Sequence, residues 1–227
     1  MKFAVIGLGF FGSALARELA ESGHEVLAID TDEAHIRELR DTVTMAAIAD
    51  GTDAGALEQL GVGGMDTVIV AVGEGFEASL MITSHCQKLK VPRVYTRVIN
   101  RVHEHLLDLM GVSGKIHAES LAAAYFARQV THESVRRYFG IDEEHGIVEM
   151  EMPEGLAGKT LAEIELRKRH RLNLVTVRRP ADRKAAAEAG EENYRVTGTP
   201  GPDFRLEEGD RLIVFGRLKD ISEFCGG

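Results

Sequence analysis

A glycine-rich loop near the start of the chain is the strongest candidate for a chemical site. The hexapeptide GLGFFG, residues 7–12, has the spacing G-x-G-x-x-G and directly follows the apolar run Phe3–Ile6. In this arrangement the first glycine permits a tight turn, the second lets a pyrophosphate approach the backbone, and the third lets helix and strand pack closely. The free N–H groups at the start of the next helix, together with the helix dipole, attract anions. The loop therefore predicts a site for the phosphates of a nucleotide.

An acidic residue stands where such a site needs one. Asp30 ends the apolar run Glu25–Asp30 and follows Gly9 by about 20 residues, the spacing at which a carboxylate accepts hydrogen bonds from a ribose diol. A carboxylate there disfavours a 2′-phosphate, so NADP is not expected. A glycine-rich turn without a ligand is the alternative, and the combination of strand, loop, helix and acid argues against it.

The residues for bond-making chemistry that accompany a cofactor in an enzyme are not evident. A nicotinamide dehydrogenase needs an acid or base, usually His, Lys or Tyr, over the nicotinamide. The sequence contains no HExxH, P-loop, GxSxG or CxxC motif, and His103 and His105 are too close in sequence to share a helix face. We therefore assign no catalytic residue and do not expect an enzyme. An NAD-dependent oxidoreductase with an unrecognised acid or base is the main alternative.

Alternating strand and helix patterns position the loop. The strand candidates are apolar on both faces, which is typical of a buried parallel sheet. Repeated βα units with right-handed crossovers predict an α/β protein with a Rossmann-like, doubly wound parallel sheet. The predicted strands are Phe3–Ile6, Glu25–Asp30, Met45–Ala49, Thr67–Val72, Arg93–Ile99 and Lys115–Ala118. The predicted helices are Gly12–Ser22, Asp32–Asp41, Asp53–Gly61, Phe76–Leu89 and Val102–Met110.

The pattern changes after Ser120. Leu121–Thr131 and Glu133–Phe139 are predicted to be two consecutive helices without a strand between them. The first is rich in apolar residues, so it is either the last helix of its domain or a helix that packs against a partner. The predicted division is a nucleotide-binding domain at residues 1–120, a helical segment at 121–140 and a C-terminal domain at 141–227.

The C-terminal domain is predicted to be small and of the α+β type. Its expected elements are the strands Ile147–Met152, Asn173–Arg178 and Arg211–Phe215, the helix Leu161–His170 and a short helix at the C-terminus. The Ala-, Glu- and Gly-rich segment Arg179–Asn193 is expected to be an exposed or mobile loop.

The composition excludes several classes of protein. The 227 residues carry a net charge of −9, which argues against nucleic-acid binding because that usually needs a basic face. No apolar run approaches the ~20 residues of a membrane-spanning helix. No basic segment followed by an apolar one precedes the first strand, so no signal peptide is expected. We therefore expect a cytoplasmic protein, and a partner in the membrane remains compatible with the composition.

In order and spacing, the motifs resemble the RCK/KTN family, the cytoplasmic regulatory subunits of Trk- and Ktr-type potassium transporters. The resemblance covers nearly the whole chain. In the first half it rests on VIGLGFFGSALARELAESGHEVLAIDTD, AIADGTDAGALEQLGVGGMDTVIVAVGEGFEAS and VPRVYTRVINRVHEHLLDLMGVSGKIHAES. In the second half it rests on VTHESVRRYF, MPEGLAGKTLAEIELRKRHRLNLVTVRR and PDFRLEEGDRLIVFG.

The resemblance implies a Rossmann domain that binds an adenine nucleotide, commonly ATP or ADP and in some members NAD(H). By this analogy the glycine loop holds phosphates, Asp30 holds the ribose, and the loops after the third and fourth strands lie by the adenine. Arg97, near the end of the fifth strand, reaches a phosphate near a dimer interface. The implied nucleotide-binding residues are Gly7, Gly9, Phe10, Phe11, Gly12, Asp30, Thr31, Asp50, Gly51, Thr52, Ala71, Val72, Gly73 and Arg97.

Two residues bear on which nucleotide is bound. Glu119 matches an acidic position that, in ATP-binding relatives, helps to hold a divalent cation such as Mg²⁺ beside the γ-phosphate, and helix capping is its alternative role. Phe10 stands where ATP-sensing relatives often carry an arginine, and it cannot supply that charge to a terminal phosphate. The choice among ATP, ADP, AMP and NAD therefore stays open, as does a role for Phe10 in packing alone.

The resemblance also implies partners. In this family the helices after the nucleotide-binding domain cross between subunits, forming homodimers that assemble into a ring, commonly an octamer. A nucleotide that fits one ring shape better shifts the population and so controls an attached membrane pore. For this chain the implied partner is an integral-membrane potassium transporter subunit of the TrkH/KtrB type, at the inner face of the cell membrane. An RCK module that regulates a different ion transporter is a further alternative.

Overall fold

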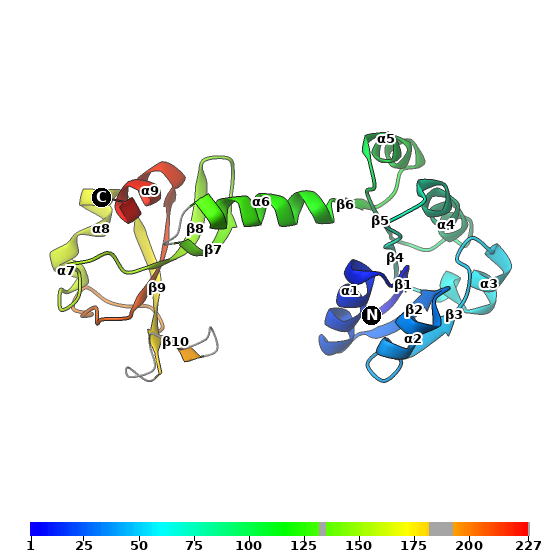
Figure 1. Cartoon of the computed structure of the whole chain (residues 1–227), viewed down its shortest axis with the longest axis horizontal. Coiled ribbons are helices and arrows are strands. Elements are labelled where there is room, and N and C mark those ends of the chain that lie inside the picture. Colours follow the sequence, from blue (N-terminus) through cyan, green and yellow to red (C-terminus); the bar gives the residue numbers. More distant parts are fainter. Residues whose placement is uncertain (132–134, 182–192, 227) are drawn as a thin grey trace. The chain divides into compact units, whose positions relative to one another are not determined.

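The computed structural model describes residues 1–131, 135–181 and 193–226, and the chain divides into two units, residues 1–121 and residues 122–227 (Figure 1). Each unit has its own sheet and its own hydrophobic core. Among the residues that the structure describes, no helix is long and apolar enough to cross a membrane.

The first unit is built on a six-stranded parallel sheet with the strand order β3-β2-β1-β4-β5-β6. The chain starts in the middle of the sheet, moves to one edge, and then returns to add β4 on the other side of β1. In such a sheet the crevice outside the carboxyl ends of the strands, where the order reverses, is the usual ligand site. The strands are β1 (Lys2–Ile6), β2 (Glu25–Asp30), β3 (Met45–Ile48), β4 (Thr67–Val70), β5 (Val94–Arg97) and β6 (Gly114–Ile116).

Helices cover both faces of this sheet because the strands carry apolar side chains on both faces. Val5 shares a core with residues of α1 and α2, whereas Ile6 shares another core with residues of α3 and α4. The helices are α1 (Phe10–Glu21), α2 (Glu33–Leu39), α3 (Ala54–Gln59), the 3-10 turn η1 (Val62–Gly64), α4 (Phe76–Lys88) and α5 (Arg101–Met110). The predicted Rossmann-like sheet is confirmed, and its element ends agree with the prediction to within about two residues.

Helix α6 (Ala118–Thr131) is followed by a strand, so the predicted helix Glu133–Phe139 is wrong. Glu133 lies outside the described residues, and β7 (Val135–Gly140) pairs antiparallel with β8 (His145–Glu151). Two consequences of this pairing outweigh the local helical pattern: Val135 becomes buried opposite Met150, and the backbone gains ladder hydrogen bonds. The turn between the strands is closed by Asp142, whose carboxylate accepts the backbone N–H groups of residues 144 and 145 at 2.8 and 2.7 Å.

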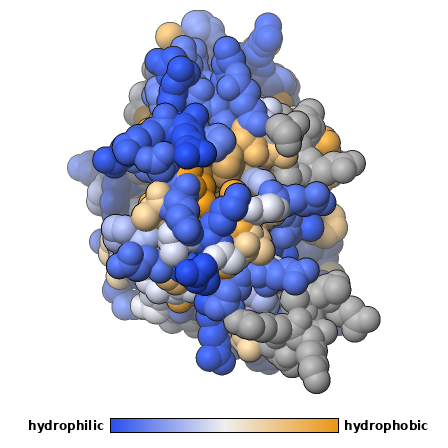
Figure 2. Space-filling view, turned by 90° about the vertical axis from the view of Figure 1, so that its left-hand side faces the viewer, coloured by the Kyte–Doolittle hydropathy of each residue, from blue (hydrophilic) through white to orange (hydrophobic). Residues whose placement is uncertain are grey.

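The second unit is an antiparallel sheet in the order β10-β9-β11-β8-β7. Its helices share one core with the sheet, through residues such as Ile164, Ile221, Met150 and Leu212. Figure 2 looks onto this unit and shows a small apolar area enclosed by hydrophilic side chains. The remaining elements are α7 (Leu161–Ile164), α8 (Leu166–His170), β9 (Asn173–Pro180), β10 (Tyr194–Val196), β11 (Arg211–Arg217) and α9 (Leu218–Gly226).

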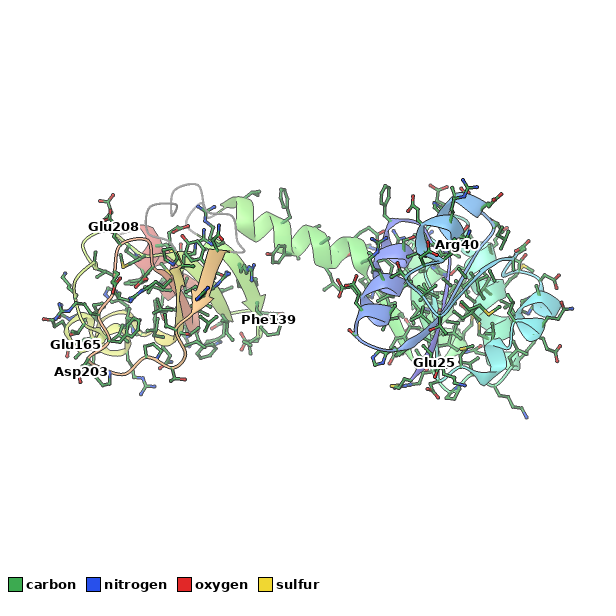
Figure 3. All side chains as sticks on the ribbon, turned by 90° about the horizontal axis from the view of Figure 1, so that it is seen from below. Glu25, Arg40, Phe139, Glu165, Asp203 and Glu208 are labelled. Atoms are coloured by element: carbon green, nitrogen blue, oxygen red, sulfur yellow. The ribbon has the colours of Figure 1, made fainter. Side chains whose placement is uncertain are left out.

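The predicted helix Leu161–His170 is interrupted at one residue. Glu165 has φ of 51°, in the left-handed region, and separates α7 from α8 (Figure 3). Its carboxylate pairs with Lys168 and Arg169 of α8 at 2.7 and 3.2 Å, so charge pairs accompany the unfavourable backbone conformation. The expected loop Arg179–Asn193 begins within β9, and residues 182–192 of it lie outside the described residues.

Candidate nucleotide-binding site

A cleft of about 710 Å³ lies at the carboxyl ends of the strands of the first unit, where the strand order reverses. The predicted site residues that line it are Gly7, Gly9, Phe10, Phe11, Asp30, Thr31, Asp50, Gly51, Thr52, Ala71, Val72, Gly73 and Arg97. Gly12 and Glu119 do not line the cleft, although Gly12 packs on Gly7 and Glu119 pairs with Arg97. Four separate loops and the end of β5 thus converge on one space.

The structure adds lining residues that sequence reasoning did not single out. Most of them directly flank predicted positions, so extending the prediction by one residue around each strand end and loop would have found them. They are Ile6, Ile29, Asp32, Ala49 and Glu74. His35 on α2 and Ala78 and Ile82 on α4 also line the cleft, and only the packing of these helices brings them there.

The glycine loop has the geometry that its spacing predicts. Gly7 has φ of 92°, and a Cβ there would lie 2.9 Å from the backbone nitrogen of Val72. A Cβ on Gly12 would lie 1.9 Å from the carbonyl oxygen of Gly7, so α1 and the loop touch backbone to backbone. A Cβ on Gly9 would meet no atom within 4 Å, which leaves the backbone at that position open to a ligand.

The start of α1 is free to bind an anion. Gly9 is its N-cap and supplies no side-chain hydrogen bond, and the first turn carries no acidic residue. By contrast, α2, α3 and α5 are capped by the side chains of Asp32, Asp53 and Asn100. Because the first N–H groups of a helix have no intrahelical acceptor, those of α1 fit a phosphate placed over Gly9.

Asp30 ties the glycine loop to the end of β2. One of its carboxylate oxygens accepts the backbone N–H of Leu8 at 2.5 Å, and the other accepts that of Asp32 at 2.8 Å. The side chain is only 13% exposed, and Nδ1 of His35 lies 3.5 Å from Oδ2. A carboxylate can accept about four hydrogen bonds, so acceptor capacity remains for a ribose diol. The side chain therefore shapes the loop and also lines the cleft.

The loop after β3 is held by the side chain of Asp50 and by a contact with α4. One Asp50 carboxylate oxygen accepts both the backbone N–H and the hydroxyl of Thr52, at 2.8 and 2.7 Å, and these bonds lower the pKa of Asp50. Nε2 of His85, on α4, lies 3.0 Å from the carbonyl oxygen of Thr52. Gly51 packs against Ile6: a Cβ on Gly51 would lie 2.8 Å from Cγ2 of Ile6. Sequence reasoning missed His85 because nothing local links it to Thr52.

Arg97 is the only arginine or lysine among the residues that line the cleft. Its guanidinium lies 5.6 Å from the centre of the Phe11 ring, and its side chain is 20% exposed. It also forms an ion pair with Glu119, in the first turn of α6. The hydrogen bond from Arg97 is the main reason that the pKa of Glu119 is lowered.

The described residues do not by themselves fit a divalent cation at Glu119. Its carboxylate is paired with Arg97, and within the described ranges no group of three or more His, Cys, Asp or Glu side chains could hold a metal ion. Mg²⁺ takes one or two carboxylates together with phosphate and water oxygens, so one paired carboxylate is an incomplete site. The role of Glu119 as a metal ligand stays a prediction.

The cleft is richer in acids than in cations. Asp30, Asp32, Asp50 and Glu74 line it, against the guanidinium of Arg97 and the imidazole of His35. Phe10 is fully exposed beside the loop, at the position where an arginine would add a second strong cation. In the single chain, the charged side chains that line the cleft are therefore mostly acidic.

A parallel sheet in this order, with a glycine loop and an acid at the end of the second strand, is the arrangement of Rossmann-type nucleotide-binding domains. Residues 3–118 match the TrkA-N domain and residues 147–226 match the TrkA-C domain. The chain therefore belongs to the family of the Trk and Ktr potassium uptake proteins, the RCK/KTN family that its motifs resemble.

The relatives agree with this membership, and a solved structure agrees with the fold. The chain is 34% identical to "Ktr system potassium uptake protein C" of Bacillus subtilis and 30% identical to "Ktr system potassium uptake protein A" of the same organism. Each alignment covers 98% of this chain and 95% of the relative. The structure described as "GsuK channel bound to NAD" is similar with a TM-score of 0.60 at 17% identity, over 98% of this chain and 38% of that one. At that identity the likeness shows the fold alone.

Proposed function

We propose that this chain is a cytoplasmic, nucleotide-sensing regulatory subunit of a potassium uptake transporter, and not an enzyme. The observation that carries the proposal is the cleft at the reversal of strand order, which an uncapped helix start and the Asp30 carboxylate both adjoin. The relatives are named potassium uptake proteins, and these names support potassium as the transported ion. The partner would be an integral-membrane subunit of the TrkH/KtrB type, and the chain would act at the inner face of the membrane.

The proposed ligand is an adenine nucleotide, either ATP or ADP or NAD(H). Its phosphates would accept N–H groups at the start of α1, its ribose would bind Asp30, and its adenine would lie by Asp50 and Thr52. NAD has support from the similar channel described as bound to it, and from the single arginine in the cleft. The bound ligand supplies a binding free energy that differs between conformations, and such a difference shifts their populations without any bond being made.

A thermal-shift screen with ATP, ADP, AMP, NAD and NADH, each with and without Mg²⁺, tests the ligand class. A nucleotide at about 100 times its Kd should stabilise the chain by about 2.7 kcal/mol, because it binds only the folded state. GTP is the matched control for recognition of adenine. If no adenine nucleotide raises the unfolding temperature, the sensor proposal fails. Steady turnover of NADH with a small metabolite would instead support an oxidoreductase.

We infer that the chain forms homodimers, which would assemble into an octameric ring as the family resemblance implies, and helix α6 supports the dimer. Its residues 121–127 are all exposed in the single chain, and Leu121, Phe126 and Val130 are 69%, 62% and 59% exposed. A helix of this length is marginal without tertiary packing, and apolar residues on several sides are typical of a helix that is covered. A second copy of the chain is the proposed cover.

The substitution Phe126→Asp should dissociate the oligomer, because it places a charge in an apolar interface. Light scattering after gel filtration should give a lower mass for this variant than for the unmodified protein. Val196→Asp, which changes a similarly exposed valine on β10, is the control and should keep the original mass. An unchanged mass for Phe126→Asp would place the interface elsewhere.

A further inference from the structure

The guanidinium of Arg97 is confined at the border between the cleft and α6. The ring of Phe11 lies on one side of it, and Gly73 approaches it so closely that a Cβ there would lie 2.9 Å from Nη1. The side chain is only 20% exposed. Arg97 therefore has little freedom to leave this place, and its partners must come to it.

Its partner Glu119 is more exposed and less confined than Arg97. The Glu119 side chain is 62% exposed, and it belongs to the first turn of α6, the helix that begins in the first unit and continues into residues of the second. An exposed carboxylate regains water when it leaves an ion pair, so the cost of separating this pair falls mainly on Arg97, which then needs another anion. Between the two residues, Glu119 is the one that can move.

A nucleotide phosphate in the cleft would be a second anion for the same cation. The phosphates proposed to bind the glycine loop would lie next to Phe11, which contacts the Arg97 guanidinium. Charge-assisted, bidentate hydrogen bonds from arginine to phosphate are stronger than a pair with an exposed carboxylate. A phosphate and Glu119 also repel each other.

We propose that Glu119 competes with the nucleotide phosphate for Arg97, so that nucleotide binding releases the first turn of α6. The proposal rests on the proposed nucleotide site and adds a route from that site to the helix that leaves the first unit. Because coupling between two binding events is reciprocal, the ion pair with Glu119 weakens nucleotide binding by the same factor by which the nucleotide weakens the ion pair.

Isothermal titration of the full chain with ADP and with NAD, in EDTA, tests the affinity half of the proposal. Glu119→Gln should lower the Kd of both nucleotides by about fivefold or more, a typical size for coupling between sites. Arg97→Gln should raise the Kd. Glu58→Gln removes an equal charge from the exposed surface of α3 and should leave the Kd within about twofold.

Hydrogen–deuterium exchange of the segment 117–127 tests the structural half. In the unmodified chain, ADP should increase exchange in this segment while it protects the glycine loop. In Glu119→Gln, exchange of the segment should be raised already without nucleotide and should not rise further.

Several results would overturn the proposal. An unchanged or raised Kd for Glu119→Gln, with normal binding by the unmodified chain, refutes the competition but leaves the nucleotide site intact. Binding that needs Mg²⁺ and is lost in Glu119→Gln makes Glu119 a cation ligand instead. The absence of binding by the unmodified chain refutes both this inference and the proposed function.

Discussion

The variant Gly9→Ala should lose nucleotide affinity by about 100-fold or more, which is about 2.7 kcal/mol, while it keeps the thermal stability of the ligand-free chain. Gly9 has φ of −60°, which alanine adopts readily, and a Cβ there would meet no protein atom within 4 Å. The same Cβ would occupy space that a pyrophosphate needs against the backbone. Alanine is a markedly poorer N-cap than glycine, but it also restricts the unfolded chain, and these two effects on stability oppose each other.

The matched variant Gly12→Ala should behave in the opposite way. Its Cβ would lie 1.9 Å from the carbonyl oxygen of Gly7, so α1 and the loop must move apart. Such a backbone clash in a buried place belongs to the class of substitutions that cost several kcal/mol of stability. Calorimetry without ligand separates the two variants, and titration with ADP or NAD then reports on Gly9→Ala. Equal stability for both variants would contradict the loop geometry. Normal nucleotide binding by Gly9→Ala would show that the phosphates do not bind at the loop.

The second large effect is expected at Asp30. Asp30→Ala should weaken binding of every adenine nucleotide by about tenfold to 100-fold, because hydrogen bonds to a charged acceptor contribute about 1.5–3 kcal/mol. It should also lower the stability of the ligand-free chain, because the N–H groups of Leu8 and Asp32 lose their acceptor. Thermal unfolding and titration with ADP and NADH measure the two effects.

A comparison of NADH with NADPH separates the ribose contact from the loop contact. The unmodified chain should favour NADH by about tenfold or more, because a 2′-phosphate would face the Asp30 carboxylate. Asp30→Asn keeps the size and one acceptor oxygen but removes the charge, so this preference should fall even if overall binding is weaker. An unchanged preference in Asp30→Asn would show that the ribose does not lie against Asp30.

Local patterns in the sequence were sufficient for the first unit. The apolar strands, the intervening helices and the glycine spacing are each written within short segments, and they predicted the parallel sheet and its element ends. The positions of Gly7 and Gly12 follow from backbone requirements that only glycine meets, and both requirements are visible in the structure. The same logic placed Asp30 at the end of β2, beside the loop.

Local patterns failed where a distant segment decides the conformation. Residues 135–139 were predicted as part of the helix Glu133–Phe139, but they belong to the strand β7 because β8 offers a pairing partner and a buried place for Val135. The predicted helix Leu161–His170 is broken at Glu165, where α7 and α8 each turn an apolar residue, Ile164 and Leu166, into the core. Burial outweighs helix propensity in both cases.

The sequence by itself determined the family, the parallel sheet and the loop with its acidic residue, because these depend on residue types at short, regular spacings. Only the tertiary structure decided what surrounds the cleft. The contact of His85 with Thr52 joins residues 33 apart, and the pair of Arg97 with Glu119 joins residues 22 apart. Such contacts depend on how helices pack against the sheet, and no local pattern of residues records that packing. The second of these contacts also decides which anion pairs with Arg97, the single arginine of the cleft, when no nucleotide is bound: it is Glu119.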